Sequence, residues 1–521
     1  MRAKKIFILL FLVSVTRGIY AQPVADTLRA GGNPLVAEQY RTANPYLMRD
    51  NASLVLLGER LLYSGISLGT EASDGDFHRP QQPARTNSYL FSAEGSTYLG
   101  GFYVSGGFDF RQASERGVQF NSIFDPYRGT PYIIADSTGG DWAKQSYGMW
   151  ASLASPFVGD RISFGLSVGL DVNRGAKKID PRPQSNTNRI DLSPSLTLRL
   201  GQGHALGGSF LYSRFREKVN LMLYDSSEPQ KIYLLKGMGQ YTYDIFSGND
   251  RERMYAGDLF GATAQYAYTS ARVSLLLGGG YRNELEETTD LEINKPRLRG
   301  RFYRTETNAF LRLNIRGDGA LHTLRGEYLR QEGSGREIIQ VFNPSPQVNA
   351  WVTESEAPRR SVTETSRVSA EYALYLHPID ESLYRWKLSL GSTLTDYSDT
   401  YDVMYSYMRF RSALTALSAE RLFSRQSWYL QAGLSAALHT VWDAALRYTE
   451  REEDDRSIAD GLVYPDFRVL SAGYASGTLS LTGGYRLPDD RSVWLRVAGG
   501  YLRAEDRLSR TSVRLTVGYT F

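Results

Sequence analysis

The sequence contains no cysteine and only five histidines among its 521 residues. Without cysteine, the chain has no disulfide framework, no thiolate metal site and no thiol to carry a lipid anchor. One histidine, His78, stands close to two carboxylates in Asp74-Gly-Asp76-Phe-His78. One interpretation of these three residues is a hydrolytic or metal-binding site, for which the sequence signal is weak. The other is a histidine in a solvated loop. We expect no cofactor and no metal.

Long hydrophobic runs are also missing. The longest, Ile6–Val15, spans ten residues, whereas a membrane-spanning helix needs roughly 20. This run follows three basic residues and precedes a stretch that ends at Ala21. That order predicts a secretory signal peptide over residues 1–21.

The charge of the chain is balanced once this predicted signal is removed. The formal net charge is +4, and residues 1–21 contain four basic residues and no acidic one, so their removal lowers it to 0. A basic excess is the electrostatic footprint of nucleic-acid binding. The balanced chain therefore predicts no nucleic-acid partner.

Strict alternation of apolar and polar residues dominates the remaining sequence. In Arg161–Asn173, every second residue from Ile162 to Val172 is apolar, and the residues between them are small or polar. The last twelve residues, Arg510–Phe521, repeat the pattern and end in an aromatic. Successive side chains of a strand point to opposite faces, so each segment predicts a strand with one apolar and one polar face.

Short and long links alternate between such segments. The short links are rich in Gly, Pro and Asp, and the longest of the others cover residues 117–144, 220–253, 333–361 and 448–465. Short periplasmic turns and long outer loops are typical of transmembrane barrels, so the sequence predicts an all-β, antiparallel up-and-down barrel of about 18 strands, with about 16 as the alternative. The predicted strands are 59–70, 88–97, 102–113, 145–155, 161–173, 187–200, 204–219, 254–269, 272–286, 299–316, 320–332, 362–377, 384–397, 404–421, 426–440, 466–486, 491–505 and 509–521.

Three parts are expected along the chain. Residues 1–21 form the signal peptide, and residues 22–58, which show no sustained period, form a periplasmic arm that serves as a partial plug. Residues 59–521 form the transmembrane barrel. A barrel of this size has an interior too wide for side chains alone to fill.

The final strand, ending in Phe521, resembles the C-terminal signature of Gram-negative outer-membrane barrels. With its signal peptide and its Gly- and Tyr-rich composition, the chain resembles the large outer-membrane β-barrels of Bacteroidota, including one family known only as a domain of unknown function. The resemblance implies an outer-membrane location, contact with outer-membrane lipid and recognition of the C-terminal strand by the barrel-insertion machinery. Surface lipoproteins or a transporter are further candidate partners. No catalytic residue is carried over, because no catalytic motif matches.

The predicted lumen face carries charges of both signs. One interpretation is a charge-lined constriction that selects solutes, and the other is a solvated wall in which opposite charges pair across strands. The candidate lumen-lining residues are Asp171, Arg189, Asp191, Arg199, Arg304, Glu306, Arg312, Glu371, Lys387, Arg496 and Arg514.

Three functions remain open. The protein is expected to be a channel or transport component for small solutes rather than an enzyme. The alternative is a partner or scaffold subunit of a surface uptake or secretion complex, with its lumen closed, and an outer-membrane hydrolase is a third. Aromatic residues of loops 117–144 and 220–253 would either stack on sugars or a partner, or form the core of the loops themselves.

Overall fold

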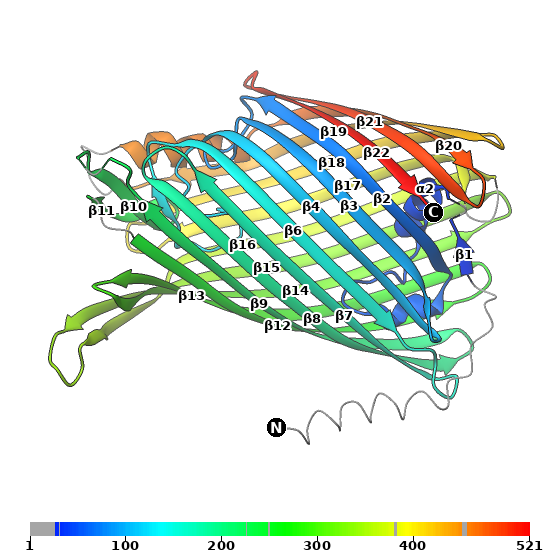
Figure 1. Cartoon of the computed structure of the whole chain (residues 1–521), viewed down its shortest axis with the longest axis horizontal. Coiled ribbons are helices and arrows are strands. Elements are labelled where there is room, and N and C mark those ends of the chain that lie inside the picture. Colours follow the sequence, from blue (N-terminus) through cyan, green and yellow to red (C-terminus); the bar gives the residue numbers. More distant parts are fainter. Residues whose placement is uncertain (1–26, 31, 226, 248–250, 380–382, 451–455) are drawn as a thin grey trace.

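The computed structural model describes residues 27–30, 32–225, 227–247, 251–379, 383–450 and 456–521. The predicted signal peptide, residues 1–21, lies outside this range. Within it, eighteen antiparallel strands form a closed barrel (Figure 1). The barrel closes where the last strand, β22 (Ser509–Thr520), pairs with the first, β2 (Arg60–Gly75). The predicted fold class and the count of eighteen strands are confirmed.

Each of the other strands pairs with its neighbours along the chain, as an up-and-down barrel requires. They are β3 (Arg85–Leu99), β4 (Phe102–Val118), β6 (Gly140–Ala154), β7 (Ile162–Lys177), β8 (Arg182–Gly201), β9 (His204–Met222), β12 (Arg251–Thr269), β13 (Val273–Glu292), β14 (Lys295–Arg316), β15 (Ala320–Asn343), β16 (Ala350–Pro378), β17 (Tyr384–Tyr401), β18 (Ser406–Ser424), β19 (Trp428–Arg447), β20 (Tyr474–Leu487) and β21 (Arg491–Ala504).

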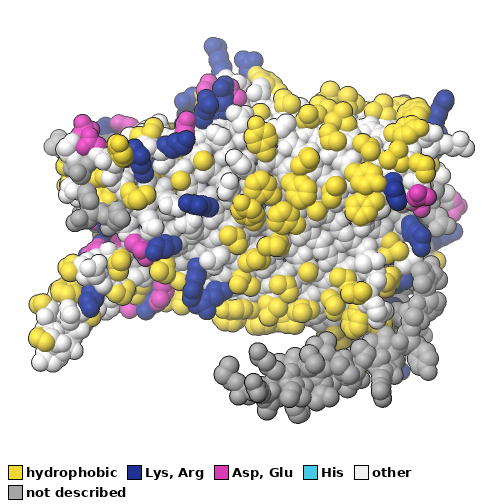
Figure 2. Space-filling view, in the orientation of Figure 1, with side chains coloured by type: hydrophobic (Ala, Val, Ile, Leu, Met, Phe, Trp, Pro, Cys, Tyr) yellow, Lys and Arg dark blue, Asp and Glu magenta, His cyan; other side chains and the backbone are white. Residues whose placement is uncertain are grey.

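The apolar face of each strand points outward. On β7, Phe164 is 55% exposed on the outer surface, whereas Ser163 and Gly165 on either side are buried inside the barrel. Figure 2 shows hydrophobic side chains over the middle and right of the wall, with charged side chains gathered mostly toward the left end. We call this band of outward-facing apolar side chains the apolar belt. Because apolar surface of this extent is rare on soluble proteins, the apolar belt marks a surface that meets an apolar phase.

The two ends of the barrel differ, as the sequence predicts. At one end, neighbouring strands are joined by short turns such as Gly100–Gly101, where both residues have the positive φ that glycine adopts readily. At the other end lie the long loops and several hairpins, of which β15–β16 extends furthest from the wall (lower left of Figure 1). No helix in the described residues is long and apolar enough to cross a membrane.

Two parts of the chain differ most from the predicted strand boundaries. Residues 333–361 are expected to be a loop, yet β15 and β16 continue through most of them, because a hairpin outside the apolar belt has water on both faces and needs no alternation. The strand predicted over 466–486 begins only at Tyr474. The preceding residues form the helix α3 (Tyr464–Leu470), which has Pro465 in its first turn, where proline is well tolerated.

The long loops contain structure of their own. Loop 220–253 includes the hairpin β10 (Gln230–Gly237) and β11 (Gln240–Phe246), which pairs with β5 (Ile134–Asp136) from loop 117–144 in a three-stranded sheet. Loop 448–473 includes the π-helix η3 (Ala459–Val463) directly before α3.

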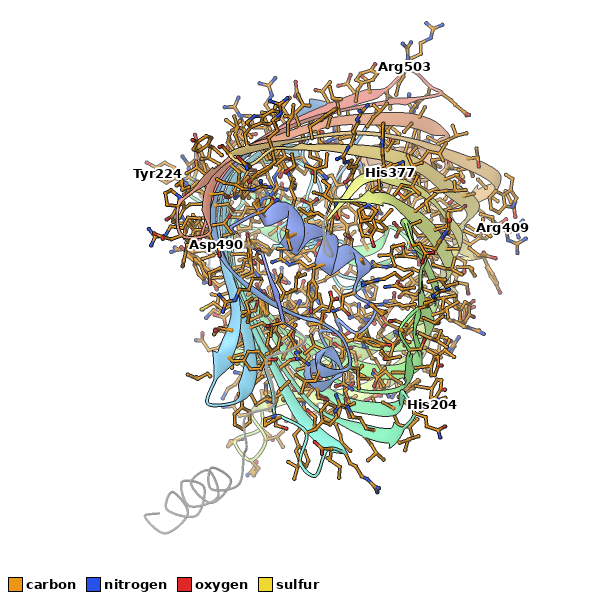
Figure 3. All side chains as sticks on the ribbon, turned by 90° about the vertical axis from the view of Figure 1, so that its right-hand side faces the viewer. His204, Tyr224, His377, Arg409, Asp490 and Arg503 are labelled. Carbon is orange, nitrogen blue, oxygen red and sulfur yellow. The ribbon has the colours of Figure 1, made fainter. Side chains whose placement is uncertain are left out.

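The segment before β2 lies inside the barrel mouth at the short-turn end. It contains β1 (Thr27–Arg29), which runs parallel to β2, the helix α2 (Pro34–Ala43) and the 3-10 helix η2 (Ala52–Leu57). Figure 3 looks into this end, with α2 crossing the opening and the labelled His204 and Asp490 on its rim. We call residues 27–30 and 32–58 the plug.

Candidate functional site

The candidate site is the barrel lumen, which the plug bounds at one end and the long loops at the other. Asparagine caps start both plug helices: the Asn33 side chain accepts a hydrogen bond from the backbone N–H of Leu35 (3.0 Å), and Asn51 accepts one from that of Ser53 (3.2 Å). α2 then packs its apolar face against the barrel wall. The cluster comprises Ala30, Leu35, Val36, Ala37, Tyr40, Leu61, Tyr63, Leu383, Leu422 and Tyr429.

Three of the predicted lumen residues bind the plug. Arg199 donates to the carbonyl oxygen of Leu56 (3.3 Å), Arg312 donates to that of Leu47 (3.0 Å), and Arg496 forms an ion pair with Glu38. Hydrogen bonds to charged groups each contribute about 1.5–3 kcal/mol. These arginines therefore act as plug contacts, a role that neither sequence interpretation of the lumen charges contains.

Four further predicted residues line a central chamber of about 410 Å³ above the plug: Arg189, Asp191, Arg304 and Glu306. The plug contributes Asp50, and Arg282 of the wall bridges Asp50 (2.8 Å) and Glu306 (3.1 Å). The chamber thus presents charges of both signs, and one of its ion pairs joins plug to wall.

The remaining predicted residues face the lumen around this chamber. Glu371 and Arg312 line an adjoining cavity of about 510 Å³. Lys387 pairs with Glu420 (3.2 Å), a cross-strand pair of the kind that the second sequence interpretation contains. Asp171 lies within electrostatic range of Asp191 and Arg189, and Arg514 stands opposite Glu71 in the closing pair of strands.

At the outer end, the long loops form a hydrophobic core together with residues of the neighbouring wall strands. We call the described parts of residues 119–139, 223–250 and 448–473 the cap. Phe120, Tyr233, Tyr241 and Phe246 of the two loops are buried in this core, which favours the second of the two interpretations, although Tyr224 and Tyr243 are exposed. The buried members of the core are Phe120, Ile123, Ile133, Ile134, Ala135, Val219, Leu221, Ile232, Tyr233, Leu234, Leu235, Met238, Tyr241, Phe246, Tyr255, Tyr401, Met408, Ile458, Leu462 and Val463.

Buried ion pairs fix the cap to the wall. Lys177 of β7 donates to both carboxyl oxygens of Asp136 in β5 (2.8 Å each), and Arg128 of the loop pairs with Glu217 (3.4 Å) and Glu286. Removing one partner of a buried pair costs about 3–5 kcal/mol. The sequence does not predict these pairs, because each joins a loop residue to a distant strand. The only local signal is the cluster of acidic residues Glu284, Glu286, Glu287 and Asp290.

The loop group around His78 is not assembled into a site. The Nδ1 atom of His78 contacts its neighbouring carbonyl oxygen at Arg79 (2.9 Å), and Asp74 accepts two hydrogen bonds from Arg85 (3.0 and 2.9 Å). In the part of the chain that the structure describes, no three His, Cys, Asp or Glu side chains gather closely enough to hold a metal ion.

The chain is similar to several proteins of known structure. The ferric yersiniabactin uptake receptor FyuA of Yersinia pestis is 8% identical, with a TM-score of 0.42 over 88% of this chain and 80% of that one. The ferric preacinetobactin receptor BauA of Acinetobacter baumannii is 10% identical, with a TM-score of 0.40 over 88% and 80%. A FadL homologue of Pseudomonas aeruginosa is 13% identical, with a TM-score of 0.33 over 92% and 96%.

At such identities no binding residue can be transferred to this chain. A comparison with curated proteins finds no match. The sequence does match the model of a family described as a family of unknown function, DUF6850, over residues 55–521, and the chain therefore belongs to that family.

Proposed function

We propose that the protein is an outer-membrane barrel of a Gram-negative bacterium and a gated transport component for small polar solutes. The apolar belt and the barrel closure support the location, with the predicted signal peptide removed and the strand ending at Phe521 recognised during insertion. The observation that carries the transport function is the charged chamber inside the barrel, which is lined by the wall and by Arg49 and Asp50 of the plug. Its predicted Bacteroidota origin stays a prediction.

The plug is the better candidate for the moving gate. Apart from the buried Tyr46, its middle section is held by polar contacts: Arg325 to the carbonyl oxygen of Thr42, Asn314 to that of Ala43 (2.6 Å) and Arg312 to that of Leu47 (3.0 Å). When the plug moves, hydrogen bonds to water can replace these contacts. Opening the cap would instead expose its apolar core to water, which is unfavourable. A solute would then pass between the wall and a displaced plug.

A closed scaffold is the second candidate. The observation that favours it is the cap, whose apolar core is continuous over three loops and reinforced by buried ion pairs. Surface lipoproteins or a transporter would be partners of such a barrel. The hydrolase alternative has no comparable support, since the described residues around His78 form no assembled site.

A reversible lock on the plug distinguishes the two candidates. The hydroxyl oxygens of Ser53 in η2 and Thr197 in β8 are 2.7 Å apart, so S53C together with T197C would place two thiols in contact in a chain that has no native cysteine. S152C with S167C is the matched control, because these hydroxyls are 2.9 Å apart on two wall strands.

Single-channel currents in planar bilayers are recorded under moderate urea, which weakens the plug contacts before the barrel unfolds. The proposal expects the oxidised S53C/T197C protein to stay silent and to conduct after reduction, whereas the control conducts in both states. If all proteins insert and remain silent with the plug free, the transport function is wrong and the scaffold is favoured.

A further inference from the structure

A second cavity of about 420 Å³ lies beneath the cap, and we call it the outer pocket. It is in the size range of small-molecule sites. Hydroxyl and amide side chains form part of its lining, among them Gln331, Thr363 and Thr365, and apolar cap residues such as Leu462 cover it. Its charged lining residues come from the wall and from three separate loops.

Asp399 of β17 faces this pocket from a position outside the apolar belt. Three residues earlier on β17, Asp396 faces outward, is exposed and pairs with Arg411 (2.9 Å), so the wall is already hydrated at this height. Backbone groups of Met238 and Thr400 hydrogen-bond to the Asp399 carboxyl group. Its Oδ1 atom is nevertheless buried without a hydrogen-bond partner among the described residues.

The other charges around the pocket are matched. Arg79 forms a two-point pair with Asp466 of α3, with one contact at 2.7 Å, and Arg304 pairs with Glu284. Arg128 is held by Glu217 and Glu286. In the described part of the chain, Asp399 forms no ion pair, so no positively charged side chain directly compensates its carboxylate.

We propose that the outer pocket binds a small polar ligand that carries one protonated amine, with the ammonium group placed on Oδ1 of Asp399. An ammonium group donates hydrogen bonds to the unpartnered oxygen and supplies the compensating positive charge. The hydroxyl and amide side chains of the wall would bind the rest of the ligand. The outer pocket would be the recognition site of the transport component, so this inference rests on the proposed function. Binding of the ligand can be measured without transport.

The protonation of Asp399 gives the binding reaction a second signature. Burial, reinforced by the nearby negative charge of Asp466 and opposed by Arg79, raises the pKa of Asp399 to about 7. Tyr397, two residues earlier on the same face, is a further titratable group in range of Arg79. An ammonium ligand favours the carboxylate, so its binding below about pH 7 releases a proton.

Titration calorimetry on the purified full chain in detergent tests the proposal. The probe is glucosamine, and N-acetylglucosamine is the matched probe from which the positive charge has been removed. The expected result is saturable glucosamine binding at millimolar concentration or tighter, with proton release, and binding of N-acetylglucosamine that is weaker by about tenfold or more.

Variants assign the effect to Asp399. D399N should weaken glucosamine binding by about tenfold or more, whereas D396N, which changes an outward-facing carboxylate on the same strand, should leave it unchanged. Equal affinity for the two probes, retained binding in a folded D399N protein or no binding to the native protein would each overturn the proposal. Binding without conductance would instead refute only the transport function.

Discussion

Replacing an outward-facing leucine in the middle of the apolar belt should destabilise the barrel far more than the same change one residue later. On β19, Leu434 is 61% exposed and lies between the outward-facing Trp428 and Trp442. Ser435 faces inward and lines the cavity of about 510 Å³ next to the chamber. The two positions therefore share a depth and a strand but not a face.

The expected magnitude follows from this depth. Arginine at the lipid midplane costs about 2–4 kcal/mol, and the cost falls to about 0–1 kcal/mol near the interfaces. Leu434→Arg should thus lower the folding equilibrium constant by roughly 30- to 800-fold, because every 1.4 kcal/mol is about tenfold. Ser435→Arg should cost much less, since the cavity beside it has room and polar partners.

Urea titrations of both variants in liposomes measure the difference. Folded protein is scored on a gel by the faster migration of the unboiled barrel, and the native protein is the reference. Equal midpoints for the two variants, or a lower midpoint for Ser435→Arg, would refute the assignment of the outer face to lipid.

Three further outcomes are expected. Arg312→Ala removes two hydrogen bonds to plug carbonyls, so it should lower the urea concentration at which bilayer current begins, whereas Arg514→Ala, which faces Glu71 across the closing strands, should not. Deleting residues 224–247 should raise single-channel conductance. The gel shift of the folded barrel should persist, because the pairing of the wall strands does not depend on the loop tips. Loss of the gel shift would contradict this independence. Burial raises the pKa of Asp399 to about 7, so the folded protein keeps a proton there that the unfolded chain loses at about pH 4. The free energy of unfolding therefore falls as the pH rises from about 4 to about 7. Protease nicking of the cap should therefore accelerate over this range, and D399N should remove the pH dependence; an unchanged profile in D399N would assign it to another group.

The barrel wall could be predicted from the sequence because the information that specifies it is local. In Arg161–Asn173 each apolar residue follows the last by two, and one face meets an apolar phase while the other meets water and polar groups. Where both faces meet water, as in the outer parts of β15 and β16, this contrast vanishes, and the sequence predicts a loop where the structure has paired strands. The failure thus has the same physical origin as the success.

The plug and the outer pocket could not be predicted in the same way. Arg312 and Arg496 belong to strands far apart in the sequence, and both meet the plug only because the closed barrel brings their strands around it. Asp399 likewise obtains its surroundings from Met238 and Asp466, which lie in two different loops. Periodicity identifies the face on which such a residue stands but not what stands opposite it.

The way the plug is anchored also dictates when it can fold. Ser492 of β21 donates to the carbonyl oxygen of Gly32, and Arg496 of the same strand pairs with Glu38, across separations of 460 and 458 residues. Contacts of such range form only after the intervening chain is in place. The plug is therefore the first part of the described chain to be synthesised, yet it cannot dock on β21 until nearly all barrel strands have been made. Closure of β2 on β22 requires contacts of similar range, so newly assembled molecules stay sealed only where docking of the plug keeps pace with closure of the barrel.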